Sequence, residues 1–273
     1  MTRVTTNRSA FPAVVGLALA LISVLWLSPA TDAQTGGEIM QTQHDRHRVR
    51  DEEEVQLMKL VNKHGDVKDR RIVRYALTGA DDLSKLLVRF RSPRDVENTA
   101  LLTWEDRDGN DDQWLYLPAI KKPKRIASSS KKNRFMGTDF SFEDLRPENL
   151  SLHKYTLVGS ETIDGQDCFV IEAVPATERQ ASDSGYSKRT LWIRKDNYYT
   201  VKREYLDKKG KLEKVEAERK LINVKGTVWR ANEVEMADVQ AGSKTIVTVE
   251  RRAIDAGLKE TAFTEAALTR EGP

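Results

Sequence analysis

The chain has 273 residues, and its 45 lysines and arginines nearly balance its 42 aspartates and glutamates, for a formal net charge of +3. This balance excludes a strongly basic nucleic-acid-binding chain, although a local basic patch can still make transient contact with an anionic membrane surface. The single cysteine, Cys168, excludes an internal disulfide, so packing and strand pairing must stabilise the fold.

Residues 1–33 have the pattern of a secretory signal peptide. Arg3 and Arg8 give a positive start, and an apolar run follows at residues 13–27. The run of about 15 residues is shorter than the roughly 20 needed to span a bilayer. We therefore expect an exported chain that is cleaved after Ala33 or Ala30.

The next stretch, residues 34–50, is polar and irregular, which predicts a mobile lead-in. A single domain is expected over residues 51–273. Residues 52–63 predict a short helix, because three glutamates suit its positive end and apolar residues follow from Leu57 to Val61.

From residue 71 to residue 254 the apolar residues recur with a period near two, interrupted by turn residues at hairpin spacing. The turn residues at 106–110 and at Asp164 and Gly165 predict two hairpins. Roughly ten strands predict a mostly β fold, an antiparallel meander curling into a barrel or half-barrel. Short helical elements are expected near residues 92–98, 139–145 and 264–268, and a disordered loop at 176–186.

The sequence contains no recognised catalytic motif. His44 and His47 have metal-ligand spacing but no further ligands nearby, which favours solvated loop residues. Cys168 lies in an apolar run, which favours a buried, inert thiol. We expect no enzyme activity, no cofactor and no metal.

Apolar and aromatic residues gather between residues 104 and 145. Alternate residues of a curved sheet line its concave face and can make a ligand cavity, although the same residues could fill a solid core. The spacing does not say which alternate set faces inward. Residues 137–145 can bury their apolar side chains by covering the mouth of the barrel. The candidate cavity and lid residues are Trp104, Trp114, Tyr116, Phe135, Met136, Phe140, Phe142 and Leu145.

A basic run occupies residues 121–134. It predicts either a docking site for an anionic headgroup or acidic partner, or a solvated mobile loop beside the lid. The candidate docking residues are Lys121, Lys122, Lys124 and Arg125.

Three stretches of this region, residues 114–118, 125–126 and above all 135–145 (FMGTDFSFEDL), resemble the outer-membrane lipoprotein-sorting proteins of the LolA-like superfamily. Residues 90–93 and 164–168 also match, and the resemblance covers about residues 67–268. It implies a periplasmic protein with an unclosed antiparallel β-barrel, covered by short helices, that holds acyl chains in its hollow. It also implies a partner, an inner-membrane lipid exporter of the resistance-nodulation-division (RND) or MMPL-like type.

We therefore expect a periplasmic carrier that binds the acyl chains of a lipid or lipoprotein in an apolar barrel cavity and transfers them between membranes. The chain is longer than the founding carriers of lipoproteins, so a hopanoid, glycolipid or phospholipid is equally compatible. The alternative is a non-catalytic accessory protein of an RND/MMPL-type exporter that binds no lipid itself.

Overall fold

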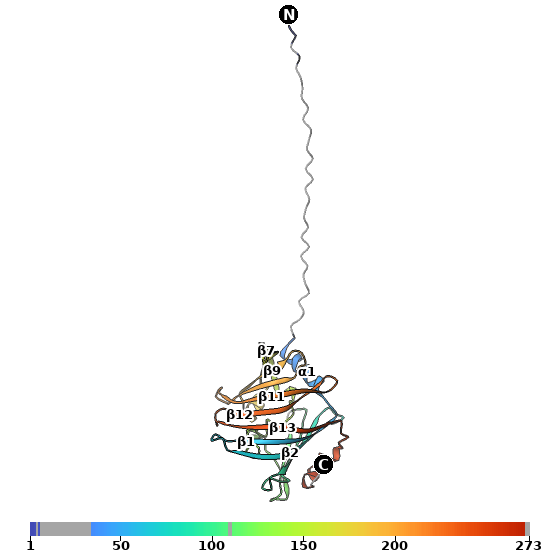
Figure 1. Ribbon diagram of the computed structural model, residues 1–273, viewed down its shortest axis with the longest axis vertical. Coiled ribbons are helices and arrows are strands. Elements are labelled where there is room, and N and C mark those ends of the chain that lie inside the picture. The colour runs from blue at the N-terminus through green and yellow to red at the C-terminus, as the bar shows by residue number, and fades with distance from the viewer. Residues whose placement is uncertain (4, 6–33, 109–110, 271–273) are drawn as a thin grey trace. The chain divides into compact units, whose positions relative to one another are not determined.

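The computed structural model describes residues 1–3, 5, 34–108 and 111–270 (Figure 1). The expected signal peptide therefore lies almost entirely outside the described residues. The chain divides into two units, Met1–Ala33 and Gln34–Pro273. The described helices and strands all belong to the second unit.

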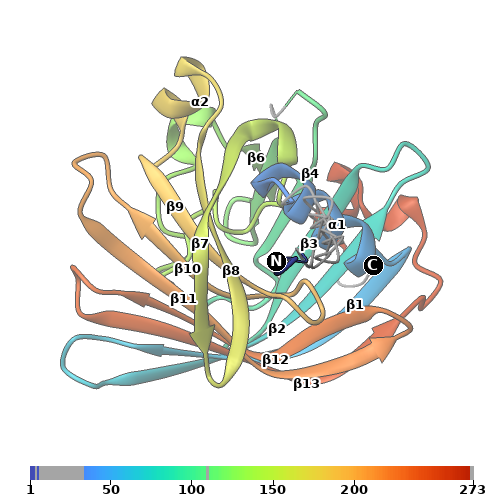
Figure 2. The ribbon, with the colours of Figure 1, turned by 90° about the horizontal axis from the view of Figure 1, so that it is seen from above.

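The second unit is built on one antiparallel sheet, with the strand order β6-β5-β4-β3-β2-β1-β13-β12-β11-β10-β9-β8-β7 over the described residues. The sheet curves strongly around an interior (Figure 2). Because β6 and β7 are edges, the barrel is unclosed, which confirms the expected fold class, although the described residues form a sheet of 13 strands instead of about ten. The strands are β1 (Asp51–Val61), β2 (Val67–Thr78), β3 (Ser84–Ser92), β4 (Ala100–Trp104), β5 (Asp112–Leu117), β6 (Lys122–Arg125), β7 (His153–Ile163), β8 (Gln166–Pro175), β9 (Lys188–Arg194), β10 (Thr200–Leu206), β11 (Leu212–Lys225), β12 (Val228–Asp238) and β13 (Ser243–Ile254).

The two predicted hairpins are confirmed. Strands β4 and β5, which flank the predicted turn at residues 106–110, pair with each other, with Trp104 opposite Asp112. Strands β7 and β8 pair around Asp164 and Gly165, whose φ angles of 49° and 75° are the left-handed values that this short turn needs.

The expected helix at residues 52–63 is wrong, because these residues form β1. Burial alternates along the strand, and Glu52, Glu54 and Gln56 are buried on the same side as Met58. The acidic run that suggested the start of a helix is therefore part of a strand with a charged interior face.

Residues 34–50 are not irregular, because they contain helix α1 (Gly36–His47). Thr35 and Glu38 form a capping box at its start. Ile39 and Met40 are buried against the inner side of β8 and β9, where they contact Ile171 and Leu191 among others. These two apolar residues in a polar stretch seat the helix against β8 and β9.

The short elements differ in part from expectation. Residues 139–145 and 92–98 form turns instead of helices. The loop expected to be disordered contains a helix, α2 (Glu178–Asp183), capped by Thr177. The expected last turn is present as a 3₁₀ helix, Glu265–Thr269.

The outer face of β2 to β5 is covered by residues 256–270, which we call the C-terminal strap. Phe263 and Leu268 of the strap are fully buried in a cluster with Tyr75 and Leu87 of the sheet. The fully buried Arg89 donates to the carbonyls of Leu268 and Ala267 at 3.2 and 3.1 Å. The strap therefore closes this face, and the hollow lies on the other.

Candidate functional site

The concave face holds a returning segment, residues 131–149, which we call the inner loop. Its tip is a tight turn in which the amide of Phe135 donates to the carbonyl of Phe140 at 2.8 Å. Met136 and Gly137 adopt positive φ angles of 49° and 75° at this turn. The Phe135 ring lies 5.6 Å from the rings of both Phe90 and Phe142. The loop is thus held inside the curved sheet by aromatic packing.

Three carboxylates tie the inner loop to other elements. Asp139 accepts from the hydroxyls of Thr245 and Ser243 on β13, at 2.7 and 2.5 Å. Glu143 accepts from the Ser184 hydroxyl, and Asp144 pairs with Lys214 of β11 at 2.9 Å. The acidic residues of the FMGTDFSFEDL stretch are therefore anchors between the loop and the sheet, and none of them caps a helix.

Between the inner loop, α1 and the sheet lies a hollow with two connected chambers of about 440 and 430 Å³. The chambers share part of their lining, including Arg74, Arg146 and Arg203. Each volume falls within the range of small-molecule pockets. We call the first the charged chamber and the second the apolar chamber, after the residues that distinguish them.

The apolar chamber lies between β1 to β3 and the tip of the inner loop. Phe135, Phe140 and Leu145 of the loop line it together with α1 and the opposing strands. The apolar residues that the strands and α1 contribute are Met40, Met58, Ile72, Ala76, Leu77, Leu86, Val88, Leu191, Val234 and Val247. This surface can hold hydrocarbon.

One wall of the charged chamber is built by β1 and its neighbours. Glu54 lies opposite Arg74 of β2 and Arg252 of β13 in the strand register. Arg252 Nε donates to a Glu54 oxygen at 2.8 Å, and Arg230 Nε lies 3.0 Å from Glu52. Burial opposes ionisation of Glu54, but the two arginines beside it lower its pKa and keep it charged.

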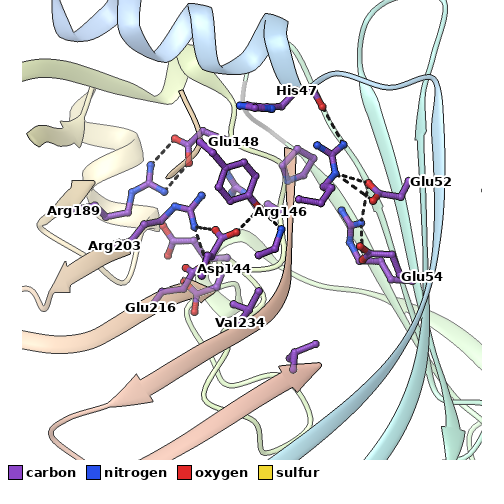
Figure 3. Close-up of a pocket in the computed structure, with 18 of the residues that line it drawn as sticks. His47, Glu52, Glu54, Asp144, Arg146, Glu148, Arg189, Arg203, Glu216 and Val234 are labelled. Atoms are coloured by element: carbon purple, nitrogen blue, oxygen red, sulfur yellow. Dashed lines mark hydrogen bonds and ion pairs between the residues drawn. The ribbon is translucent and has the colours of Figure 1, made fainter. Parts of the chain in front are cut away.

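The opposite wall comes from β9, β10 and β11 (Figure 3). Arg203 Nη1 donates to Glu216 at 2.7 Å and to Glu218 at 2.5 Å. Arg189 makes a two-pronged contact with Glu148 of the inner loop, at 3.0 and 2.8 Å. Burial opposes the charge on Glu148, but the Arg189 guanidinium more than offsets this and holds the pKa of Glu148 well below its usual range.

Two histidines flank the charged chamber and are neutral at physiological pH. Burial and the charge of Arg230 lower the pKa of His47 to about 4. Burial and Arg189 lower the pKa of His153 to about 3. His47 Nδ1 accepts from the amide of Trp229 at 3.2 Å, which fixes the ring between α1 and β12.

The structure separates the sequence-predicted cavity and lid residues into three groups. Phe135, Phe140 and Leu145 line the apolar chamber. Phe142 and Met136 pack in the apolar cluster beside that chamber. The three aromatic residues of the hairpin, Trp104, Trp114 and Tyr116, line neither chamber.

These three instead pack on the outer face in the cluster under the C-terminal strap. The Trp104 indole donates to the carbonyl of Phe263 at 2.7 Å. The alternate residues of these strands, Leu101 and Leu115, face the inner loop. The aromatic side chains of the hairpin therefore point to the outer face and not into the cavity, because the other set of alternate residues faces inward.

The predicted docking residues lie along an edge of the sheet. Lys122, Lys124 and Arg125 belong to β6, and Lys121 precedes it with a positive φ of 55°. The run of residues 121–134 is only partly a solvated loop, because Lys131 is buried and donates to the carbonyl of Asp111 at 2.6 Å. Lysines on an edge strand also discourage pairing with another sheet.

Sequence reasoning missed the charged wall of the hollow. Its residues occur at alternate positions in strands, as in Glu52 and Glu54 or Glu216 and Glu218. Acidic residues two apart in one strand, opposite arginines in the next, are the signal that could have found them. Residues 34–108 and 111–270 contain no group of three or more side chains placed to hold a metal ion.

A family model described as that of an uncharacterized protein matches residues 82–270. No curated protein matches the chain. In the part of the chain that the structure describes, neither helix has the length and apolar character needed to cross a bilayer.

Several solved structures share this fold. A domain from Vibrio parahaemolyticus, provisionally described as that of an outer membrane lipoprotein-sorting protein, is 34% identical, with a TM-score of 0.82 over 86% of this chain and 98% of that one. A DUF1329 family protein from Desulfovibrio piger is 29% identical, with a TM-score of 0.80 over 85% and 97% of the two chains. A LolA superfamily protein from Nitrosomonas europaea is 19% identical, with a TM-score of 0.68 over 86% and 100%, which shows the fold alone.

Proposed function

Because this chain belongs to the outer-membrane lipoprotein-sorting protein family, with the LolA-like fold, we propose that it is a periplasmic carrier of an amphipathic lipid. The acyl chains of the lipid or lipoprotein occupy the apolar chamber, and the carrier moves them between membranes. No bond of the cargo is made or broken in this role.

The apolar chamber is the observation that carries the proposal. Three apolar side chains of the inner loop and apolar residues of β1 to β3 form a large part of its lining. Burying hydrocarbon there removes it from water, at roughly 25 cal/mol for each Å². A carrier needs such a protected surface, because a free acyl chain cannot cross an aqueous compartment as a monomer in quantity.

The inner loop supplies the cover in this proposal. It is attached through Asp139, Glu143 and Asp144, so its position depends on a few polar anchors as well as on packing. Entry of a lipid requires the tip around Phe140 to move relative to β1 to β3.

The decisive experiment is lipid extraction and mass spectrometry of the full chain after export and purification. We expect a stoichiometric lipid in the wild type and loss of that lipid in Phe140→Asp, which places a charge in the apolar chamber. Val158→Asp is the matched control, because Val158 is 51% exposed and lies on β7, away from the chamber lining. Lipid-free wild-type protein that also fails to take up added lipid would refute the carrier function.

The family resemblance also implies an exporter of the RND or MMPL type as a partner. We propose this as the membrane donor or acceptor of the cargo. Cross-linking in membranes, followed by identification of the captured inner-membrane protein, tests it. If the wild-type chain captures no such exporter but still carries lipid, the exporter is refuted as a partner and the carrier function stands.

A further inference from the structure

The carboxylates of the charged chamber are already satisfied by donors of the protein. Both oxygens of Glu54 accept, from Arg252 at 2.8 Å and from Gln56 at 2.7 Å. Both oxygens of Glu148 accept from Arg189, at 2.8 and 3.0 Å. The two glutamates of β11 accept from Arg203 and from tyrosine hydroxyls. The chamber therefore offers a ligand few acceptor atoms in need of a donor.

The arginines of the chamber fall into two classes. Arg252 uses all three of its nitrogens, on Glu54, Asn232 and the carbonyl of Ala231. Arg230 likewise donates to Glu52 and to two backbone carbonyls. These two guanidinium groups hold the wall together and have no spare donor nitrogen.

Arg74, Arg146 and Arg203 are different, because each engages the protein through one nitrogen. Arg74 and Arg203 use Nη1, and Arg146 places Nε 2.9 Å from Asp111. Within the described residues, their other nitrogens have no protein partner. The side chains of Arg74, Arg146 and Arg203 are 31%, 13% and 18% exposed, respectively. Spare guanidinium donors at a cavity require an acceptor from water or from a ligand.

These three arginines also share a location. Each lines both the charged and the apolar chamber, so they meet at the junction between the two. Arg189 and Arg252, in contrast, line only the charged chamber. Arg230 also lines both chambers, but it has no spare nitrogen. Figure 3 shows Arg146 between the wall that carries Arg203 and the wall that carries Glu52 and Glu54. The polar end of an amphiphile whose chain fills the apolar chamber would reach this junction.

We infer that Arg74, Arg146 and Arg203 bind an anionic, acceptor-rich group, a phosphate or carboxylate, at the polar end of the carried lipid. This inference rests on the proposed carrier function and names the class of its cargo. The fork of a guanidinium group matches the oxygens of phosphate and carboxylate in pairs. The oxygens of the chamber's glutamates already have donors, because each glutamate is paired with an arginine except Glu143, which accepts from the Ser184 hydroxyl and the Gly185 amide.

The test compares two fluorescent lipids with identical acyl chains, a phosphatidylglycerol and an uncharged diacylglycerol. We expect the wild type to bind the phosphatidylglycerol about tenfold more tightly or better, since one charged hydrogen bond contributes about 1.5 kcal/mol or more. Arg74→Gln and Arg146→Gln should each lose about tenfold for the anionic lipid and nothing for the diacylglycerol. Arg71→Gln is the matched control, because Arg71 is on the same strand as Arg74 but 53% exposed and paired with Glu250.

A further variant guards against misfolding. Arg203→Lys keeps the charge between Glu216 and Glu218 but removes the fork, so it should fold and still lose affinity for the anionic lipid. Circular dichroism and urea unfolding check that each variant is folded.

The outcomes separate the two proposals. Binding of neither lipid by the wild type would refute the carrier function, and the inference with it. Equal binding of both lipids, unchanged in Arg74→Gln and Arg146→Gln, would leave the carrier standing and overturn the inference. Inorganic phosphate provides the last arm: binding of phosphate as tight as that of the lipid would mark a free-phosphate site and overturn the assignment to a lipid headgroup.

Discussion

The ion pair between Lys214 and Asp144 offers a quantitative test of how the inner loop is held. Lys214 Nζ lies 2.9 Å from Asp144 Oδ2 and 2.9 Å from the hydroxyl of Tyr186. The two charged side chains are 4% and 2% exposed. Replacing Lys214 by methionine keeps the apolar stem and removes the charge, so Asp144 remains buried without its cation.

Removing one partner of a buried pair costs about 3–5 kcal/mol. We expect the lower end, about 3 kcal/mol, because the Ser141 amide at 2.7 Å and the Tyr186 hydroxyl at 2.8 Å still donate to Asp144. For a domain of this size the corresponding fall in Tm is about 6–12 °C. The double variant Asp144→Leu with Lys214→Met should be closer to the wild type than Lys214→Met alone, because no unpaired charge remains.

Urea unfolding at neutral pH measures the free energy of unfolding of the single and the double variant, provided the m-value is the same for all of them. Lys220→Met is the matched control on the same strand: Lys220 pairs with Glu233 but is 63% exposed, so its loss should cost at most about 1 kcal/mol. A cost below about 1 kcal/mol for Lys214→Met, or strict additivity in the double-mutant cycle, would show that the pair does not anchor the loop.

The remaining predictions concern the core, the outer face and pH. Phe142→Ala should lower the free energy of unfolding by about 3–5 kcal/mol in urea, since the ring is 7% exposed and packs on Phe135; a loss under about 1 kcal/mol would contradict this packing. Phe263→Ala should cost a similar amount yet leave lipid binding by the folded protein unchanged, because the strap covers the face opposite the hollow. His47 and His153 have lowered pKa values in the fold, about 4 and about 3, so the unfolded chain binds more protons below about pH 6.5. The contribution of the two histidines to stability should therefore be complete above that pH and fall as the pH drops toward 4, by at most about 1.4 kcal/mol per pH unit per histidine. The test measures the drop in urea midpoint between pH 7.5 and pH 5, for the wild type and for a His47→Gln, His153→Gln double variant. An equal or larger drop in the double variant would contradict the prediction.

The fold class could be predicted because its signals are local. Alternation along each strand and turn residues such as Asp164 and Gly165 fix hairpins within a few residues of sequence. The strand β1 was missed because a run of glutamates is compatible with a helix start, and its true partners, such as Arg252, lie at the other end of the chain. Helix α1 was missed because its two anchors, Ile39 and Met40, find their apolar surface on β8 and β9.

The candidate site could be predicted only in its apolar half. Phe135, Phe140 and Leu145 sit in a recognisable stretch, and an apolar segment must cover something. The residues of the hairpin strands that face inward could not be predicted, because Leu101 is buried on one face and Trp104 is half-buried on the other. A sheet covered on both sides, by the strap and by the inner loop, has no polar side to show which face is outward.

The pairing of β1 with β13 has a consequence for how the domain forms. It joins Glu52 to Ile254 in the middle of the sheet, so the central seam consists of the first and the last strand of the chain. Hairpins on either side can form as their residues become available, but the two halves cannot be joined until the final strand has arrived. Pairing between residues so distant in sequence is slow, because a long loop must close first. A ribosome-stalled or C-terminally shortened chain would therefore hold two unjoined half-sheets, and protease resistance should appear abruptly when β13 is added.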